Sequence, residues 1–79
     1  MNMKLVEAIG IRLDNLLKEK NLKQNHLSKM GGIPRSTICV TRSAKRKTVT
    51  VDTLYQICAT MEITLKEFFD DAIFEDVTD

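Results

Sequence analysis

Residues 34–47 read PRSTICVTRSAKRK, and the conformation of this stretch decides the fold. Its central TICVT and the VTV at 49–51 are rich in β-branched residues, which favour strands. One interpretation is therefore a β-hairpin closed by the RSAKRK turn. A lone two-stranded hairpin is only marginally stable in water, however, and no other segment of the chain has the pattern of a strand. We therefore predict a helix over 34–42 and an extended polar connection over 43–50.

The residues before this stretch have the pattern of two helices. Between residues 5 and 20 the apolar side chains recur at i, i+4, i+7 and i+8, which is the period of one helix face: Ile9, Leu13, Leu16 and Leu17. Asn21 can end this helix, and a shorter helix is expected from Gln24 to the glycines at 31–32. Pro34 suits the first turn of the next helix, where its missing N–H would be unpaired anyway.

The residues after the stretch predict two more helices and a tail. Leu54, Ile57, Cys58 and Met61 lie on one face of a helix over 51–62, and Thr50 can cap its start. Thr64 and Glu67 have the spacing of a capping box, which predicts a fifth helix. We expect an all-α domain over residues 1–69 and an acidic tail over 70–79 that is either packed or dimer-forming.

Length and composition restrict the chain to one small domain. At 79 residues and 43% apolar content, a compact single core is expected. The sequence contains no signal-peptide pattern and no run approaching the ~20 apolar residues of a membrane span, so we expect a soluble, cytoplasmic protein. Cys58 falls within an apolar helical pattern, which favours a small buried side chain over a disulfide with Cys39. One histidine, His26, and two distant cysteines give no zinc spacing, and we expect neither metal nor cofactor.

Charge is unevenly distributed along the chain. Residues 1–47 hold 11 of the 12 lysines and arginines and three acidic residues, whereas residues 48–79 hold one lysine and eight acidic residues. The two parts therefore carry +8 and −7. Charged residues commonly do no more than cover a surface, but this contrast favours a cationic face that binds a polyanion.

Five residues have the spacing of a helix-turn-helix motif. Leu27 and Ile33 can pack two helices together, Ser28 is small enough to let them cross closely, and Gly32 can supply the turn. Ile38 is the inward-facing residue of the second helix. This set alone is moderately specific, because apolar residues at helical spacing usually indicate only a core.

The wider pattern resembles the Cro/repressor-type (XRE-like) helix-turn-helix family over residues 9–69. The resemblance rests on IGIRLDNLLKEKNLKQNHLSKMGGIPRSTI and on KRKTVTVDTLYQICATMEITLKEFF. It implies a five-helix domain of the phage-repressor type, in which the third helix lies in the major groove of double-stranded DNA and the last two helices brace it.

The resemblance also implies roles for individual residues. Gln24 matches the residue that binds a phosphate and orients its neighbour. Arg35 and Ser36 match the first base-contacting positions, where arginine suits guanine O6 and N7. Cys39 and Val40 match further groove-facing positions, and the residues that follow match the backbone-binding loop. The full predicted set of DNA-binding residues is Gln24, Arg35, Ser36, Cys39, Val40, Arg42, Ser43, Lys45, Arg46 and Lys47.

The chain departs from the family at the end of the predicted recognition helix. The family usually has glycine where Ala44 stands, and alanine tolerates a positive φ poorly. It usually has an apolar residue at Thr41, Asn-Pro at 48–49 and a Thr or Ser cap at Lys23. We expect the region around 41–50 to differ most from the family.

Each of these roles has an ordinary alternative. Arg35 could be a plain surface arginine, and 45–47 a solvated loop or a localisation tag. No paired titratable groups suggest an enzyme. The chief rival to a DNA-binding repressor is a protein-interaction module, or an antitoxin-like partner, that uses the same fold.

We expect a homodimer on DNA, with an interface from Leu65 through Val77.

Overall fold

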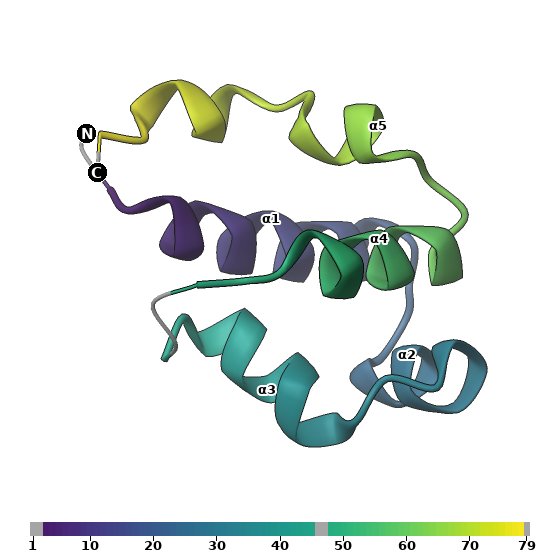
Figure 1. Cartoon of the computed structure of the whole chain (residues 1–79). Helices are drawn as coiled ribbons and strands as arrows, with labels where there is room; N and C mark the ends of the chain where they lie inside the picture. Colours follow the sequence, from purple (N-terminus) through teal and green to yellow (C-terminus); the bar gives the residue numbers. More distant parts are fainter. Residues whose placement is uncertain (1–2, 46–47, 79) are drawn as a thin grey trace.

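The computed structural model describes residues 3–45 and 48–78, and these residues are largely helical (Figure 1). An isolated bridge joins Met3 and Val77, and the described residues form no strand. No helix among them is long and apolar enough to cross a membrane. The prediction of an all-α protein with five helices is confirmed. The helices are α1 (Leu5–Glu19), α2 (Gln24–Gly31), α3 (Arg35–Ser43), α4 (Val51–Thr60) and α5 (Leu65–Phe69), followed by the short 3₁₀-helix η1 (Ala72–Asp76).

The β-branched stretch forms α3, because its inward side chains are buried. Ile38 is fully buried and Thr41 is 5% exposed. The Thr41 hydroxyl donates a hydrogen bond to the carbonyl of Thr37 at 2.7 Å, so its burial leaves no polar group unpaired. Burial against the neighbouring helices thus outweighs the local strand propensity.

The start of α3 differs by one residue from the prediction. Pro34 has φ −57° and ψ 139°, so it lies just outside the helix instead of in its first turn. Its carbonyl still accepts a hydrogen bond from the amide of Ile38 at 3.2 Å. Gly32, with φ 66°, makes the left-handed turn that separates α2 from α3.

The end of α3 uses a left-handed alanine. Ala44 has φ 56° and ψ 32°, and its amide donates to the carbonyl of Val40. The amide of Lys45 donates to the same carbonyl at 3.2 Å. The helix therefore ends with the geometry that glycine usually supplies, although alanine makes this conformation cost about 1–2 kcal/mol.

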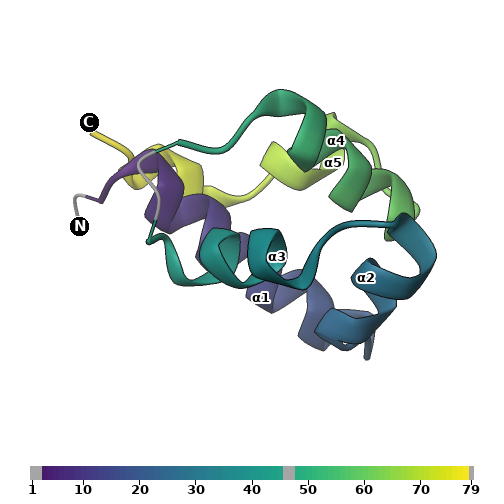
Figure 2. The same ribbon diagram turned by 60° about the horizontal axis from the view of Figure 1, so that its bottom comes forward.

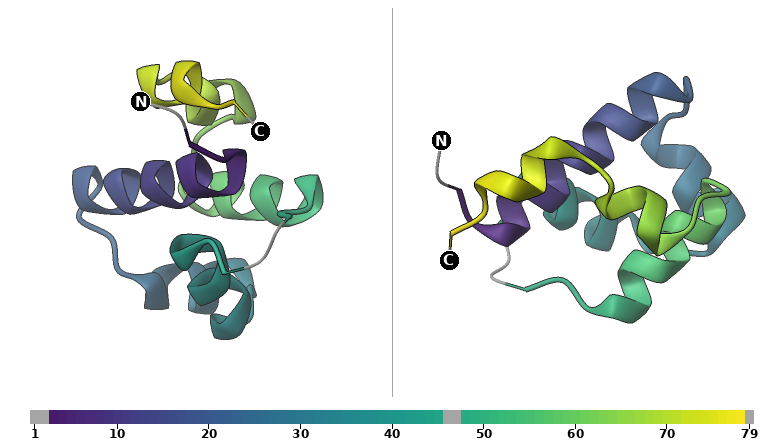
Figure 3. Two further views of the ribbon diagram at one scale, coloured as in Figure 1. Left: turned by 90° about the vertical axis from the view of Figure 1, so that its left-hand side faces the viewer. Right: turned by 90° about the horizontal axis from the view of Figure 1, so that it is seen from above.

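The helices form three layers. In Figure 1, α1 and α4 lie in the middle, α2 and α3 on one side, and α5 and η1 on the other; the end-on view in Figure 3 shows the same order. A single apolar core joins the layers, and Leu13, Leu27, Ile38, Ile57 and Phe68 are fully buried within it. Cys58, 1% exposed, also belongs to this core as predicted, and both cysteines are free.

The caps predicted for the last two helices are present. The Thr50 hydroxyl accepts from the amide of Thr53 at 3.2 Å at the start of α4. At α5 the Thr64 hydroxyl accepts from the amide of Glu67 at 3.0 Å, while the Glu67 carboxylate accepts from the amide of Thr64 at 3.0 Å. This reciprocal pair satisfies two amides that helix geometry would leave free.

Arg12 attaches the layer that contains α5 and η1 to α1. Its Nε donates to the carbonyl of Phe68 at 2.8 Å, and its Nη2 donates to the carbonyl of Glu67 at 3.0 Å. Its Nη1 pairs with Asp71 at 3.2 Å. The Arg12 side chain is 12% exposed, so these contacts hold the end of α5 in a partly dry environment.

Residues 70–78 lie along α1 and bring the two ends of the described chain together (Figure 1). The amide of Met3 donates to the carbonyl of Asp76 at 3.0 Å, and the amide of Thr78 donates to the carbonyl of Met3 at 3.0 Å. The rings of Phe69 and Phe74 are 4.9 Å apart. The tail is thus anchored by backbone hydrogen bonds and aromatic packing.

Candidate nucleic-acid interface

One face of α3 is directed away from the core, and it carries half of the predicted DNA-binding residues. Figure 2 looks toward the layer that contains α2 and α3. Because helical neighbours are three and four residues apart, the side chains opposite Ile38 and Thr41 fall on one outward face. The exposed residues of this face are Arg35, Ser36, Cys39, Arg42 and Ser43. The structure therefore brings five of the ten predicted residues onto one surface.

Three of the remaining predicted residues lie at the borders of this face. Gln24 is half-buried at the first turn of α2, and Lys45 is exposed just after α3. Val40 is half-buried and lines a cavity between α3 and residues 48–50, so it is less open to the outside than was expected of a groove-facing residue. Arg46 and Lys47 lie outside the described residues.

Arg42 contacts both of the other helices in its neighbourhood. Its Nε donates to Oδ1 of Asp14 on α1 at 2.5 Å, and its Nη1 donates to Oε1 of Gln24 on α2 at 2.8 Å. A shallow hollow at this junction is lined by Asp14, Gln24, Cys39, Arg42 and Ser43. Gln24 and Arg42 were predicted from the sequence to lie at the interface, but neither their contact nor the contact with Asp14 was predicted.

A close approach of α1 sets the position of α3. A Cβ atom at Gly10 would lie 2.6 Å from the carbonyl oxygen of Arg42 and 2.9 Å from that of Thr41. Only glycine fits there without moving one helix. A glycine inside an amphipathic helix pattern is a sequence signal for such a contact, but this contact was not among the predictions made from the sequence.

The two outer layers carry opposite charge. Residues 24–45 contain four basic residues and no acidic ones: Lys29, Arg35, Arg42 and Lys45. Residues 65–78, on the opposite side in Figure 1, contain one lysine and five acidic residues. The uneven charge seen along the sequence thus becomes a polarity across the molecule, with its positive side at α3. Such a field attracts a polyanion to that side.

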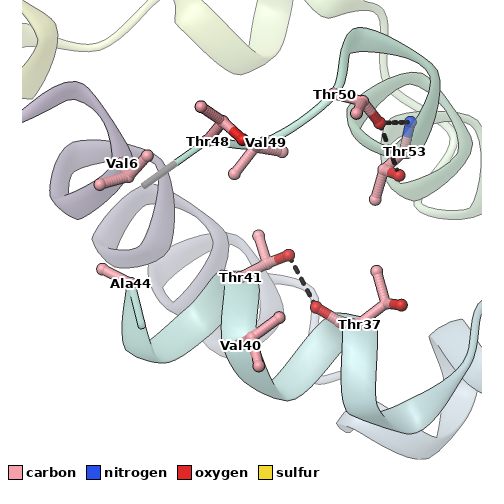
Figure 4. Close-up of a pocket in the computed structure, with 9 residues that line it drawn as sticks. All are labelled: Val6, Thr37, Val40, Thr41, Ala44, Thr48, Val49, Thr50 and Thr53. Atoms are coloured by element: carbon pink, nitrogen blue, oxygen red, sulfur yellow. Dashed lines mark hydrogen bonds between the residues drawn. The ribbon is translucent and has the colours of Figure 1, made fainter. Parts of the chain in front are cut away.

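The cavity behind α3 is small. It encloses about 100 Å³ and is lined by threonine and valine side chains, among them Thr37, Val40, Thr41 and Val49 (Figure 4). Sites for small organic ligands usually measure ≈ 300–1,000 Å³. This cavity is therefore smaller than sites of that kind.

No group of three or more metal-ligating side chains occurs in the described part of the chain. Burial raises the pKa of Cys58 to about 11, against a smaller opposing effect of the Arg12 charge, so this thiol stays protonated near neutral pH.

Comparisons with known proteins show which family the chain is similar to. A family model described as the Cro/C1-type HTH DNA-binding domain matches residues 12–72. The solved structure of prophage Lp1 protein 11 is 27% identical, with a TM-score of 0.77, over 90% of this chain and 92% of that one. No curated protein matches the chain.

A further solved structure has the same fold at lower identity. It is the restriction-modification controller protein C.Esp1396I as a tetramer with its natural 35 base-pair operator. Its TM-score is 0.80 at 19% identity, over 95% of this chain and 96% of that chain. The family model, which covers most of the chain, carries the assignment: the chain belongs to the Cro/C1-type helix-turn-helix DNA-binding family.

Proposed function

We propose that this protein is a sequence-specific transcriptional regulator, a repressor, which inserts α3 into the major groove of double-stranded DNA. The observation that carries the proposal is the outward face of α3, which is exposed, lies in a layer without acidic residues and begins with Arg35. We place its action in the cytoplasm, on chromosomal or phage DNA.

The proposed contacts divide into two kinds. Arg35 has two parallel N–H groups that suit guanine O6 and N7, and Ser36 and Cys39 lie beside it on the same face. Ser43 and Lys45 lie at the end of the helix, where they can contact phosphates, as can Arg46 and Lys47 by sequence. Val40, which is half-buried, can at most touch a thymine methyl group from the edge of the groove.

We further propose that the protein binds DNA as a homodimer. A nine-residue helix reads only a few base pairs, so a second copy on a half-site ≈ 34–36 Å away is needed for specificity. The controller protein with the same fold is described as a tetramer on its operator, which supports an oligomer here. The proposed interface is Leu65 through Val77, where the Phe69 side chain is 41% exposed.

The proposal is tested by selecting bound sequences from random DNA and then measuring affinity against salt. We expect a selected site with two related half-sites, and an affinity that falls with salt at a slope of about −0.9 per phosphate contacted. Arg35→Ala should lower affinity for the selected site about 10-fold to 100-fold while non-specific binding changes little. Lys20→Ala replaces an exposed lysine just after α1, outside both the face of α3 and the proposed dimer interface, so it is the matched control and should change neither.

The result that contradicts the proposal is equally distinct. If no sequence is enriched, and DNA is not retained even at low salt, the face of α3 does not bind DNA. The same fold would then serve as a protein-interaction or antitoxin-like module, which would bind its partner with little dependence on salt.

A further inference from the structure

The guanidinium of Arg42 joins three helices at the edge of the proposed DNA-binding face. It donates to the Asp14 carboxylate on α1 through Nε at 2.5 Å and to the Gln24 side chain on α2 through Nη1 at 2.8 Å. The two contacts use different nitrogen atoms, so one planar group holds both partners at once. The side chains of Arg42 and Asp14 remain 38% and 35% exposed, so the junction opens to solvent.

The contact with Arg42 determines which way the Gln24 amide faces. A guanidinium has only hydrogen-bond donors, so the atom of Gln24 directed at it must be the carbonyl oxygen Oε1. The NH₂ group of Gln24 is then directed away from Arg42. Without this partner the amide could turn and present either its oxygen or its nitrogen atom to a ligand. Bound to Arg42, Gln24 presents a donor.

Asp14 balances the charge of Arg42. A carboxylate bound to the guanidinium leaves the pair with no net charge, and it occupies the Nε–H, which blocks the side-on two-pronged contact that Nε and Nη2 would make with a phosphate. A DNA phosphate would have to displace Asp14 to gain that contact. The exposed Lys45, in contrast, lies beyond the end of α3 and belongs to no such pair among the contacts of the described chain.

From this geometry we propose that Arg42 is a positioning residue for DNA binding: anchored by Asp14, it fixes the Gln24 amide with its NH₂ group free to donate to a phosphate oxygen or to an acceptor on a base edge. Arg42 itself then contributes no phosphate contact, although the sequence analysis placed it in the DNA-binding set. The inference rests on the proposed function, since it assigns roles within the same DNA-binding surface.

The first test is a double-mutant cycle on the selected DNA site. Arg42→Lys should lower affinity about threefold to tenfold, because lysine cannot hold Asp14 and Gln24 together. Gln24→Ala should lower affinity by a similar factor, and the two changes together should lower affinity by no more than either change alone. If Arg42 bound a phosphate directly, lysine would replace it well and the two losses would multiply. Wild-type affinity in Arg42→Lys, or multiplied losses, overturns the proposal.

The second test uses the salt dependence of binding. The charge-neutral double variant Asp14→Asn/Arg42→Met should keep the wild-type slope of log affinity against log salt concentration. Lys45→Met, in contrast, should reduce the size of this slope by about 0.9. A reduction of about 0.9 in the double variant would make Arg42 a phosphate contact and overturn the proposal. Thermal unfolding of each variant separates these effects from loss of the fold.

A final measurement needs no DNA, so it separates failure of this inference from failure of the proposed function. The chain has two glutamines, Gln24 and the exposed Gln56 on α4, whose side-chain NH₂ groups give separate NMR signals in the free protein. In Arg42→Lys the Gln24 NH₂ signals should shift and the Gln56 signals should not. Unchanged Gln24 signals would overturn the positioning role, whether or not the wild-type protein binds DNA.

Discussion

Replacing Gly10 by alanine tests the packing that holds the proposed recognition helix in place. The new Cβ atom would lie 2.6 Å from the carbonyl oxygen of Arg42 and 2.9 Å from that of Thr41. Both oxygens belong to the backbone of α3, so no side-chain rotation can relieve the contact. Moving from 2.6 Å to the 3.4 Å of ordinary contact requires a displacement of roughly 0.8 Å between α1 and α3.

Two opposing terms decide the effect of Gly10→Ala on stability. Alanine in place of glycine within a helix gains about 0.5–1 kcal/mol. Overpacking a well-packed contact costs about 1–3 kcal/mol, and the upper part of that range applies here because backbone atoms must move. We therefore expect a net loss of about 1–2 kcal/mol in the free energy of unfolding. For a domain of this size that lowers Tm by about 5–15 °C.

Thermal and urea unfolding measure this change, and Asn15→Ala is the matched control. Asn15 is exposed on the same helix, so its replacement should leave stability within about ±0.5 kcal/mol or raise it slightly. Gly10→Ala should also weaken specific DNA binding more than non-specific binding, because base contacts depend more on the position of α3 than phosphate contacts do. A Gly10→Ala protein as stable as Asn15→Ala would refute the close approach of α1 and α3.

Three further predictions concern the other layers of the fold. Ala44→Gly should stabilise the protein by about 0.5–1 kcal/mol in urea unfolding, because it relieves a left-handed alanine. The same change at the helical, exposed Ala59 should destabilise it by about 1 kcal/mol. A loss of stability at both sites would contradict the geometry of the α3 end. Arg12→Met should lower the free energy of unfolding by about 1–3 kcal/mol and increase hydrogen exchange in residues 65–78, since three hydrogen bonds to α5 and the tail are lost. An equal increase in exchange across the whole chain would contradict the role of Arg12 in attaching these residues to α1. A thiol reagent at pH 8 should label Cys39 alone in the native protein, and rapid labelling of both thiols would contradict the burial of Cys58. The free energy of unfolding should fall as the pH rises from 9 through about 11, because the raised pKa of buried Cys58 makes the folded state retain its proton. A free energy of unfolding that does not change over this pH range would also contradict the burial.

Local sequence signals predicted much of the fold. The Thr50 cap and the reciprocal Thr64–Glu67 pair involve residues only three positions apart, so their spacing alone predicts the contacts. The burial of Cys58 followed from helical periodicity in the same way. At α3 the local signal was misleading, because its β-branched residues favour a strand. Only the flanking helix patterns identified it as a helix.

The remaining features depend on contacts between distant residues. Arg12 meets Phe68 across 56 positions, and Arg42 meets Asp14 across 28, so no spacing pattern predicts either contact. The departure from the family at Thr41 is accommodated because its hydroxyl bonds to Thr37 within the helix, which leaves its carbon atoms free to pack. Roles on the outward face of α3, including those of Arg35 and Ser36, stay predictions until DNA is bound.

Methylation protection of guanine N7 on the selected DNA site tests the central claim most directly, because N7 lies in the major groove. We expect protected guanines in two clusters about one helical turn apart. Arg35→Ala should expose one guanine in each cluster and leave the others protected. Protection confined to one isolated half-site at full affinity would contradict the dimer. The absence of any protected guanine, with binding intact, would contradict insertion of α3 into the major groove.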